Sequence, residues 1–220
     1  MPPVKSFKEL LEQNMDTTLK NRVPHIILLY WIIKIASTTL GETGADMFSM
    51  TYNLGYGQTI LIFLTVFAIL LGIKLLIKRY DPVLYWLVFT ASAILGTAIS
   101  DFIDRTLKLG YTAGADVLVT LLIISLAAWY KKEKVINVES ITTLNAEVFY
   151  WISFLLANTL GTAAGDFAAD VLGLGFRNSA ILISTLLAII ALLHLYTKTS
   201  KALLFWLAFV LTRPFGATFG

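Results

Sequence analysis

Long apolar runs separated by short charged clusters are the feature that most constrains how this chain can fold. The runs cover residues 24–48, 57–77, 82–107, 111–130, 144–172, 178–196 and 201–220. Each run approaches the roughly 20 residues that an α-helix needs to cross the hydrocarbon core of a bilayer. Only 14% of the residues are charged, whereas soluble domains carry roughly 25%. The sequence therefore predicts an all-α integral membrane protein with seven transmembrane helices.

The segment before the first span is different in character. Residues 1–22 carry both Lys and Glu, and they lack the cleavage site of a secretory signal peptide. Their apolar side chains fall near one helical face: Phe7, Leu10, Leu11, Met15 and Leu19. We expect residues 1–22 to form an amphipathic helix on the membrane surface and residues 23–220 to form a single transmembrane domain.

Basic residues are sorted between the two sides of the predicted membrane. Twelve of the 17 lie in the N-terminal segment and in the second, fourth and sixth connections: Lys5, Lys8, Lys20, Arg22, Lys74, Lys78, Arg79, Lys131, Lys132, Lys134, Lys198 and Lys201. The opposite connections hold Arg105, Lys108 and Arg177. By the positive-inside rule, we expect a multi-pass protein of a bacterial-type inner (cytoplasmic) membrane with its N-terminus in the cytoplasm.

An internal repeat organises the spans. An aromatic residue followed by tryptophan recurs at Tyr30-Trp31, Tyr85-Trp86, Tyr150-Trp151 and Phe205-Trp206. Ten residues after each tryptophan comes a glycine: Gly41, Gly96, Gly161 and Gly216. Five residues further comes an aspartate: Asp46, Asp101 and Asp166. The units are residues 23–80, 81–140, 141–199 and a partial fourth, 200–220. Each complete unit has two spans, so the repeats are parallel, and a complete fourth unit would bring an eighth helix.

Through these tryptophans and the glycine–aspartate spacing, the chain resembles the bacterial uncharacterised membrane-anchored proteins, a family of four tandem two-helix repeats, each with a characteristic tryptophan. The resemblance covers essentially the whole chain. It implies the tandem-repeat fold and brings no established activity with it. The incomplete fourth unit is the one departure from the family pattern.

The repeated glycines begin small-xxx-small pairs, which let membrane helices approach closely. We expect a helix-packing role for Gly41, Gly96, Gly161, Gly165, Gly216 and Gly220. The first helix of each unit is then an inner helix. The second helices are almost uniformly apolar, so we expect the odd-numbered helices inside and the even-numbered helices facing lipid.

Polar residues form a stripe along each first helix, because side chains four positions apart are neighbours on a helix surface. In the first unit the stripe is Lys34, Thr38, Glu42 and Asp46. Polar residues at the same positions of the later units are Thr97, Asp101, Asn158, Thr162, Asp166 and Arg213. Four inner helices around one axis would stack these residues into layers. The layer of Lys34 is otherwise aromatic: Phe89, Phe154 and Phe209. The pattern predicts an acidic vestibule, a mixed polar site and an aromatic plug.

Each charge has a structural and a functional interpretation. Charges at bilayer depth usually pair or line water, so Glu42 is expected either to neutralise Lys34 or Arg213 or to lie on a solute or proton path. The repeated aspartates either cap the following turn or form an acidic ring for cations. Oxygen ligands suit hard cations, which makes Glu42, Asp46, Asp101 and Asp166 candidate ligands of a divalent metal.

We therefore expect a small transporter or channel-like protein that moves a small cation, either a divalent metal or a proton-coupled cation. Lys34 and Arg213 keep open a carrier of an organic anion or zwitterion. A non-transporting membrane scaffold is the third alternative. No nucleophile–base motif appears, so we predict neither enzymatic activity nor a cofactor beyond a bound divalent cation. The expected partners are the lipid bilayer and a small solute or ion, with no nucleic acid; a homo-oligomer is compatible with the sequence.

Overall fold

The computed structural model describes residues 21–217 of the chain. The surface helix expected within residues 1–22 lies outside the described residues, except for Asn21 and Arg22. Gly220 and the contacts of Gly216 also lie outside what the structure describes, so their packing role stays a prediction.

Within the described residues there is one α-helix for each predicted span, and no strand. The helices are α2 (Leu28–Asp46), α3 (Gly55–Leu76), α4 (Pro82–Asp101), α5 (Tyr111–Glu133), α6 (Leu144–Asp166), α7 (Gly175–Tyr196) and α8 (Lys201–Ala217). Five of them are long and apolar enough to cross a membrane: α3, α4, α5, α6 and α7. The other two are the short α8 and the more polar α2, which contains Lys34 and Glu42. The protein is thus an all-α, multi-pass membrane protein.

The first helices of the four units form a closed ring. α2 packs against α4, α4 against α6, α6 against α8, and α8 returns to α2. Over their most apolar stretches, α4 and α6 are each 61% buried, whereas α7 is 11% buried. The prediction that the first helix of each unit lies inside and the second helix outside is confirmed: the inner helices are α2, α4, α6 and α8, and the outer helices are α3, α5 and α7.

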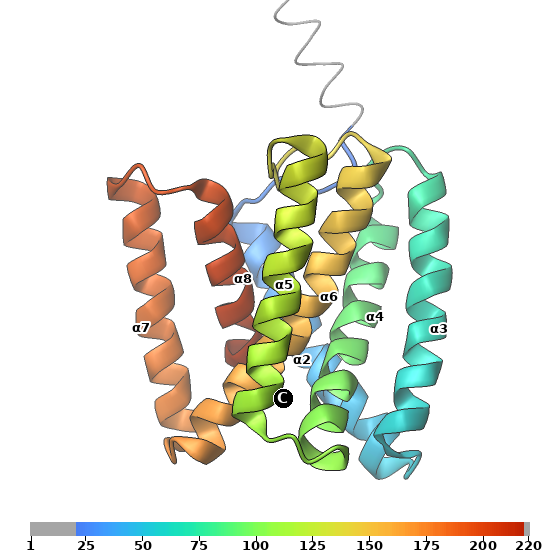
Figure 1. Cartoon of the computed structure of the whole chain (residues 1–220), viewed down its shortest axis with the longest axis vertical. Helices are drawn as coiled ribbons and strands as arrows, with labels where there is room; N and C mark the ends of the chain where they lie inside the picture. Colours follow the sequence, from blue (N-terminus) through green and yellow to red (C-terminus); the bar gives the residue numbers. More distant parts are fainter. Residues whose placement is uncertain (1–20, 218–220) are drawn as a thin grey trace, which may run out of the picture.

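Each outer helix is displaced by one unit around the ring. α3 packs against α4, α5 against α6 and α7 against α8, rather than each against the inner helix that precedes it. In Figure 1, α3 and α7 lie on opposite flanks of the molecule, beside α4 and α8 respectively. This displacement interlocks consecutive units, so no single unit folds back on itself as an isolated hairpin.

The repeated glycines lie where neighbouring inner helices cross. A Cβ atom added to Gly41 would lie 2.6 Å from Ala93 Cβ, and one added to Gly161 would lie 2.5 Å from Arg213 Cβ. At Gly96 the nearest neighbour would be Asn158 Cβ at 3.1 Å. Each of these glycines therefore contacts the residue seven positions after the tryptophan of the next unit. These three glycines thus lie at helix crossings with no room for a side chain, which is the geometry that the predicted packing role requires.

Each complete unit turns between its two helices through the same local structure. Short π-helical segments follow the first helices: η1 (Met47–Thr51), η2 (Phe102–Thr106) and η3 (Phe167–Val171). A glycine with positive φ stands at the start of each following helix: Gly55 (+74°) and Gly175 (+65°) are the first residues of α3 and α7, and Gly110 (+79°) directly precedes α5. Glycine adopts this conformation without steric strain, which accounts for its recurrence at that position.

Candidate functional site

The polar residues predicted from the repeat lie inside the ring of inner helices. Seven of the ten are at most 2% exposed: Lys34, Thr38, Thr97, Asp101, Asn158, Thr162 and Arg213. The other three, Glu42, Asp46 and Asp166, are partly exposed. Below, the aspartate end is the end of the ring that carries Asp46, Asp101 and Asp166. The N-terminal end is the opposite end, which carries residues 21–27.

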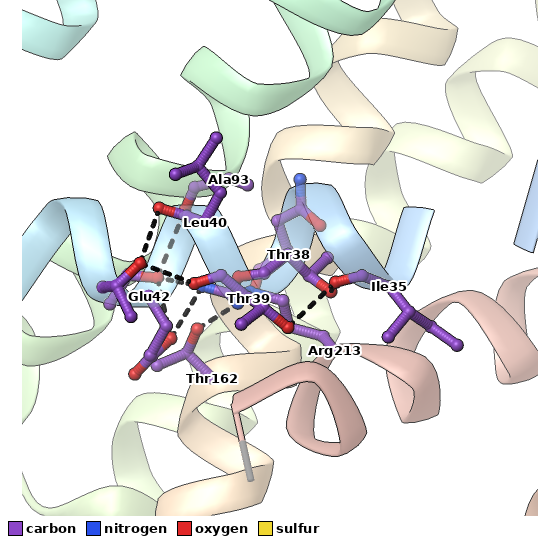
Figure 2. Close-up of polar contacts among 11 residues, drawn as sticks. Ile35, Thr38, Thr39, Leu40, Glu42, Ala93, Thr162 and Arg213 are labelled. Carbon is purple, nitrogen blue, oxygen red and sulfur yellow. Dashed lines mark hydrogen bonds and ion pairs between the residues drawn. The ribbon is translucent and has the colours of Figure 1, made fainter. Parts of the chain in front are cut away.

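An ion pair joins α2 to α8 inside the ring. Arg213 Nη2 lies 2.8 Å from Glu42 Oε2, and the Arg213 side chain has no exposed surface. Figure 2 shows the two side chains converging beside Thr38. Of the two pairings predicted for Glu42, the structure contains the one with Arg213.

Further oxygen atoms complete the surroundings of the guanidinium. Arg213 Nη1 donates to the Thr38 carbonyl over 2.6 Å, and Nη2 donates to Thr97 Oγ1. Thr97 Oγ1 in turn lies 3.1 Å from Glu42 Oε2, to which it donates. We call the Glu42 carboxylate, the Thr97 hydroxyl and the Thr38 carbonyl the acceptor set. Because α2 supplies two of these oxygens and α4 the third, the acceptor set exists only when both helices are in place.

Local sequence explains how Arg213 enters such a crowded interface. The absence of a side chain at Gly161 lets the backbone of α6 approach the base of the Arg213 side chain. Pro214 follows directly and lies within α8. Proline has no amide hydrogen, so the carbonyl of Val210, four residues earlier, loses its helical hydrogen bond. The helix that carries Arg213 is therefore weakened at that residue.

A second buried cation lies two helical turns along α2, towards the N-terminal end. Lys34 Nζ donates to the Phe209 carbonyl over 3.0 Å and to Thr212 Oγ1 over 2.5 Å. It also lies 4.1 Å from the centroid of the Phe209 ring. Among the described residues no carboxylate forms a salt bridge with Lys34. The Lys34 side chain is therefore held by neutral groups alone, and a charge without a counterion would be costly at bilayer depth.

Aromatic side chains fill the axis beside Lys34. The Phe154 ring centroid lies 4.2 Å from that of Phe209 and 5.6 Å from that of Phe89. All three phenylalanines have no exposed surface. Closer to the N-terminal end, Tyr85 and Tyr150 are also fully buried or nearly so, with their hydroxyl oxygens 2.7 Å apart. The layer predicted as an aromatic plug is thus closed in this structure.

Two polar atoms near the middle of the ring lack a hydrogen-bond partner among the described residues: Asn158 Oδ1 and Arg213 Nε. Asn158 Nδ2 donates to Ser92 Oγ over 3.0 Å, so only one side of this amide is satisfied. A buried polar atom without a partner is destabilising. Water or a solute is the kind of group that would satisfy both atoms.

The three repeated aspartates each occupy the last position of an inner α-helix, directly before a π-helical segment. None of them makes a side-chain capping hydrogen bond, so the predicted capping role is wrong. Asp101 is 2% exposed, and its Oδ1 lies 3.5 Å from Arg105 Nε. Arg105 Nη1 also donates to the Tyr56 hydroxyl over 3.1 Å. The Arg105 guanidinium thus links Asp101 to the outer helix α3 at the aspartate end.

The carboxylates do not assemble into a metal-ligand group in this conformation. Among residues 21–217, no three Asp, Glu or His side chains come close enough together to hold a metal ion. The four candidate ligands, Glu42, Asp46, Asp101 and Asp166, therefore lie along the axis without converging on one point. Metal binding by these residues stays a prediction.

The sequence did not predict a buried charge cluster at the N-terminal end. Glu147 Oε2 lies 2.6 Å from Arg22 Nη1, and Glu147 Oε1 lies 2.8 Å from Lys74 Nζ. The Glu147 and Lys74 side chains have no exposed surface. The sequence did contain one signal for this cluster: Lys74 near the end of one apolar span and Glu147 near the start of another are predicted to lie at the same depth in the membrane. That signal was weak, because the repeat gives no reason to expect α3 and α6 to be neighbours.

Residues 21–23, which we call the strap, bind this region together. The Asn21 side chain accepts from Ile141 N over 2.9 Å and donates to the Glu139 carbonyl over 3.0 Å. The Asn21 carbonyl accepts from Tyr80 N over 2.9 Å. The strap therefore joins the α3–α4 connection to the α5–α6 connection, beside the Glu147 cluster of Glu147, Arg22 and Lys74.

Comparison with known protein families identifies the repeat. The model of one family, described as Repeat of Unknown Function (DUF347), matches residues 29–80, 84–134 and 149–200. These matches correspond to the three complete units, and α8 continues the same register as a fourth inner helix. No curated protein and no solved structure matches the chain. The three matches cover well over half of the sequence, and the chain belongs to the DUF347 repeat family.

Proposed function

We propose that the protein is a small transporter that moves a cationic solute along the axis of α2, α4, α6 and α8. The observation that carries the proposal is the Glu42–Arg213 ion pair, held inside the ring on a polar stripe that recurs in successive units. Ionisable residues at bilayer depth are expensive to place there and commonly mark a solute or ion path. We assign the chain no enzymatic activity.

The two ends of the axis have the properties that such a path requires. At the aspartate end, Asp101 interacts electrostatically with Asp166, Glu42 and Asp46, and Arg105 offsets part of this negative charge. A group of carboxylates raises the local concentration of cations. At the other end, Phe89, Phe154 and Phe209 close the axis. In our proposal the structure represents a state that admits a cation from the aspartate end and is closed at the N-terminal end.

The positive-inside rule gives this state an orientation in the membrane. The N-terminal end carries the basic connections, so we assign it to the cytoplasm and the aspartate end to the outside of an inner membrane. A cation then enters from outside, reaches Glu42 and leaves once the aromatic layer separates.

A carrier of a zwitterion or an organic anion is the second candidate, and Lys34 is the observation that favours it. Its ammonium is fully buried without a carboxylate partner among the described residues. A solute with its own carboxylate would supply that partner, while its cationic group would occupy the Glu42 layer. A non-transporting scaffold is the third candidate, in which the same ion pair only holds α2 against α8.

Transport into proteoliposomes tests the proposal. We expect Glu42→Gln, reconstituted as folded protein, to lose saturable uptake of a cationic tracer, because the axis loses its central negative charge. Asp116→Asn is the matched control, since Asp116 is an exposed carboxylate on the outer helix α5, and its uptake should equal that of wild type. Uptake equal to that of empty vesicles for wild type, over metal, ammonium and guanidinium tracers, would favour the scaffold.

A further inference from the structure

The acceptor set is arranged around a nitrogen cation. Glu42, Thr97 and Thr38 each direct one oxygen at the guanidinium of Arg213. These oxygens include one carboxylate, one hydroxyl and one backbone carbonyl. Such acceptors match the several N–H donors of a guanidinium or an ammonium, which need directed hydrogen bonds.

The second buried cation repeats this chemistry. The Lys34 ammonium is held by the Phe209 carbonyl, the Thr212 hydroxyl and the face of the Phe209 ring. Carbonyls, hydroxyls and aromatic faces are recurrent partners of organic ammonium groups. The Lys34 nitrogen and the Arg213 guanidinium are thus both held by neutral oxygens together with, at most, one carboxylate.

A divalent metal ion has different requirements. Mg²⁺ and Ca²⁺ are bound by several oxygen ligands at once, usually with more than one carboxylate. No group of three acidic or histidine side chains comes together within residues 21–217. In this structure the Arg213 guanidinium already faces Glu42, and its positive charge opposes a divalent ion more strongly than a monovalent one.

Arg213 is placed so that it can leave the acceptor set. Its Nε has no partner among the described residues, so one donor of the guanidinium is unsatisfied in the present position. Pro214 removes the helical hydrogen bond one turn before it, which weakens α8 at this point. A mobile resident cation and a fixed set of acceptors are the components of an exchange site.

We infer that the transported solute carries a guanidinium or primary ammonium group, and that this group displaces Arg213 from the acceptor set of Glu42, Thr97 and Thr38. The inference rests on the proposed transport function and names its substrate class. Arg213 occupies the site when the solute is absent and returns when the solute leaves. The positive charge facing Glu42 is therefore nearly constant through the cycle, so the carboxylate is never left unpaired.

Chemical rescue tests the acceptor set directly. In Arg213→Ala the guanidinium is gone while the three acceptors remain, so the purified protein should be less stable to heat. Methylguanidinium at millimolar concentration should restore the melting temperature in a saturable manner, by a rise of roughly 2–4 °C. Mg²⁺ and Mn²⁺ should have no such effect. In Arg213→Ala combined with Glu42→Gln, methylguanidinium should also have no effect.

Uptake by the wild-type protein tests the exchange itself. Radiolabelled methylguanidinium and methylammonium should enter wild-type proteoliposomes with saturation and should compete with each other, whereas Glu42→Gln proteoliposomes should show no saturable uptake. This measurement does not depend on whether Arg213→Ala folds. Asp116→Asn again serves as the control.

The outcomes separate the two levels of the proposal. Saturable uptake of Mn²⁺ or Mg²⁺ without uptake of methylguanidinium or methylammonium would overturn the substrate class and leave transport standing. If methylguanidinium restores the melting temperature of Arg213→Ala but no tracer enters wild-type proteoliposomes, the transport proposal and its substrate class are both overturned. The acceptor set would then have a purely structural role. Absence of rescue in a folded Arg213→Ala protein would overturn the exchange.

Discussion

At the scale of single residues, two kinds of position determine the interior of this protein. Glycines at the repeated position set how closely the inner helices approach, and charged residues on the stripe set what lies between them. The two are linked, because Gly161 contacts the base of the Arg213 side chain. The residue that carries the central positive charge is therefore also a packing residue, and its position depends on a neighbour with no side chain.

Gly161→Ala is expected to destabilise the protein. The new Cβ would lie 2.5 Å from Arg213 Cβ and 2.9 Å from the Val210 carbonyl, and neither group is the flexible end of a side chain. Overpacking of this kind destabilises by about 1–3 kcal/mol. The matched control is Gly72→Ala on α3, where no atom lies within 4 Å of the added Cβ. The melting temperature in detergent should fall for the first variant only; equal shifts would contradict the close contact.

At the scale of elements, the strap connects parts of the chain that the repeat leaves unconnected. It lies beside the Glu147 cluster, where one buried carboxylate faces two cations contributed by α3 and by the strap. Removing one partner from a buried ion cluster leaves the others uncompensated. The N-terminal end is therefore more sensitive to the loss of Glu147 than to the loss of either base.

Glu147→Gln is expected to lower the free energy of unfolding by roughly 3–5 kcal/mol, because Lys74 and Arg22 would keep their charges without a carboxylate. Glu139→Gln is the matched control, since Glu139 is an exposed acid in the α5–α6 connection. Thermal unfolding of both variants measures the difference. A Glu147→Gln protein as stable as the control would mean that water reaches the cluster and screens it.

The periodicity of the sequence predicted the helices and most of the polar residues that lie inside the ring. Lys34, Thr38, Glu42 and Asp46 share a helix face whatever the tertiary structure, and the repeat places the other units in register with them. The partner of Glu42 was not predictable, because Lys34 and Arg213 were equally compatible with it until the crossing of α2 and α8 was known. The Glu147 cluster was missed because it joins α3 to α6, which lie in different units, through a strap that has no counterpart in the repeat.

At the scale of the whole molecule, the parallel repeat gives the bundle two chemically different ends. The basic connections lie at the N-terminal end, and the repeated aspartates lie at the other. The displaced packing of α3, α5 and α7 ties each unit to the next around the ring. All units therefore share one orientation in the membrane. Labelling one exposed residue at either end is enough to determine it.

The chain contains no cysteine, so one introduced cysteine is a unique label. We expect Leu109→Cys, an exposed position in the α4–α5 connection, to react with a membrane-impermeant thiol reagent added to intact cells. Lys132→Cys, an exposed position at the opposite end of α5, should react only after the membrane is opened. The reverse pattern would invert the orientation given by the basic connections, and the direction assigned to the aspartate end with it.

Parallel repeats also constrain how such a bundle can alternate its access. In carriers built from inverted repeats, the two halves exchange conformations, so the inward-facing state is a pseudo-symmetric copy of the outward-facing one. Here every inner helix starts at the same end, and no exchange of units can convert the aspartate end into the aromatic one. If the protein alternates access as we propose, its two open states are not related by symmetry, and a solute should then have a different half-saturation concentration on each face of the membrane. Influx and efflux, measured separately, should then differ in their half-saturation concentrations, although the solute still reaches the same equilibrium distribution across the membrane.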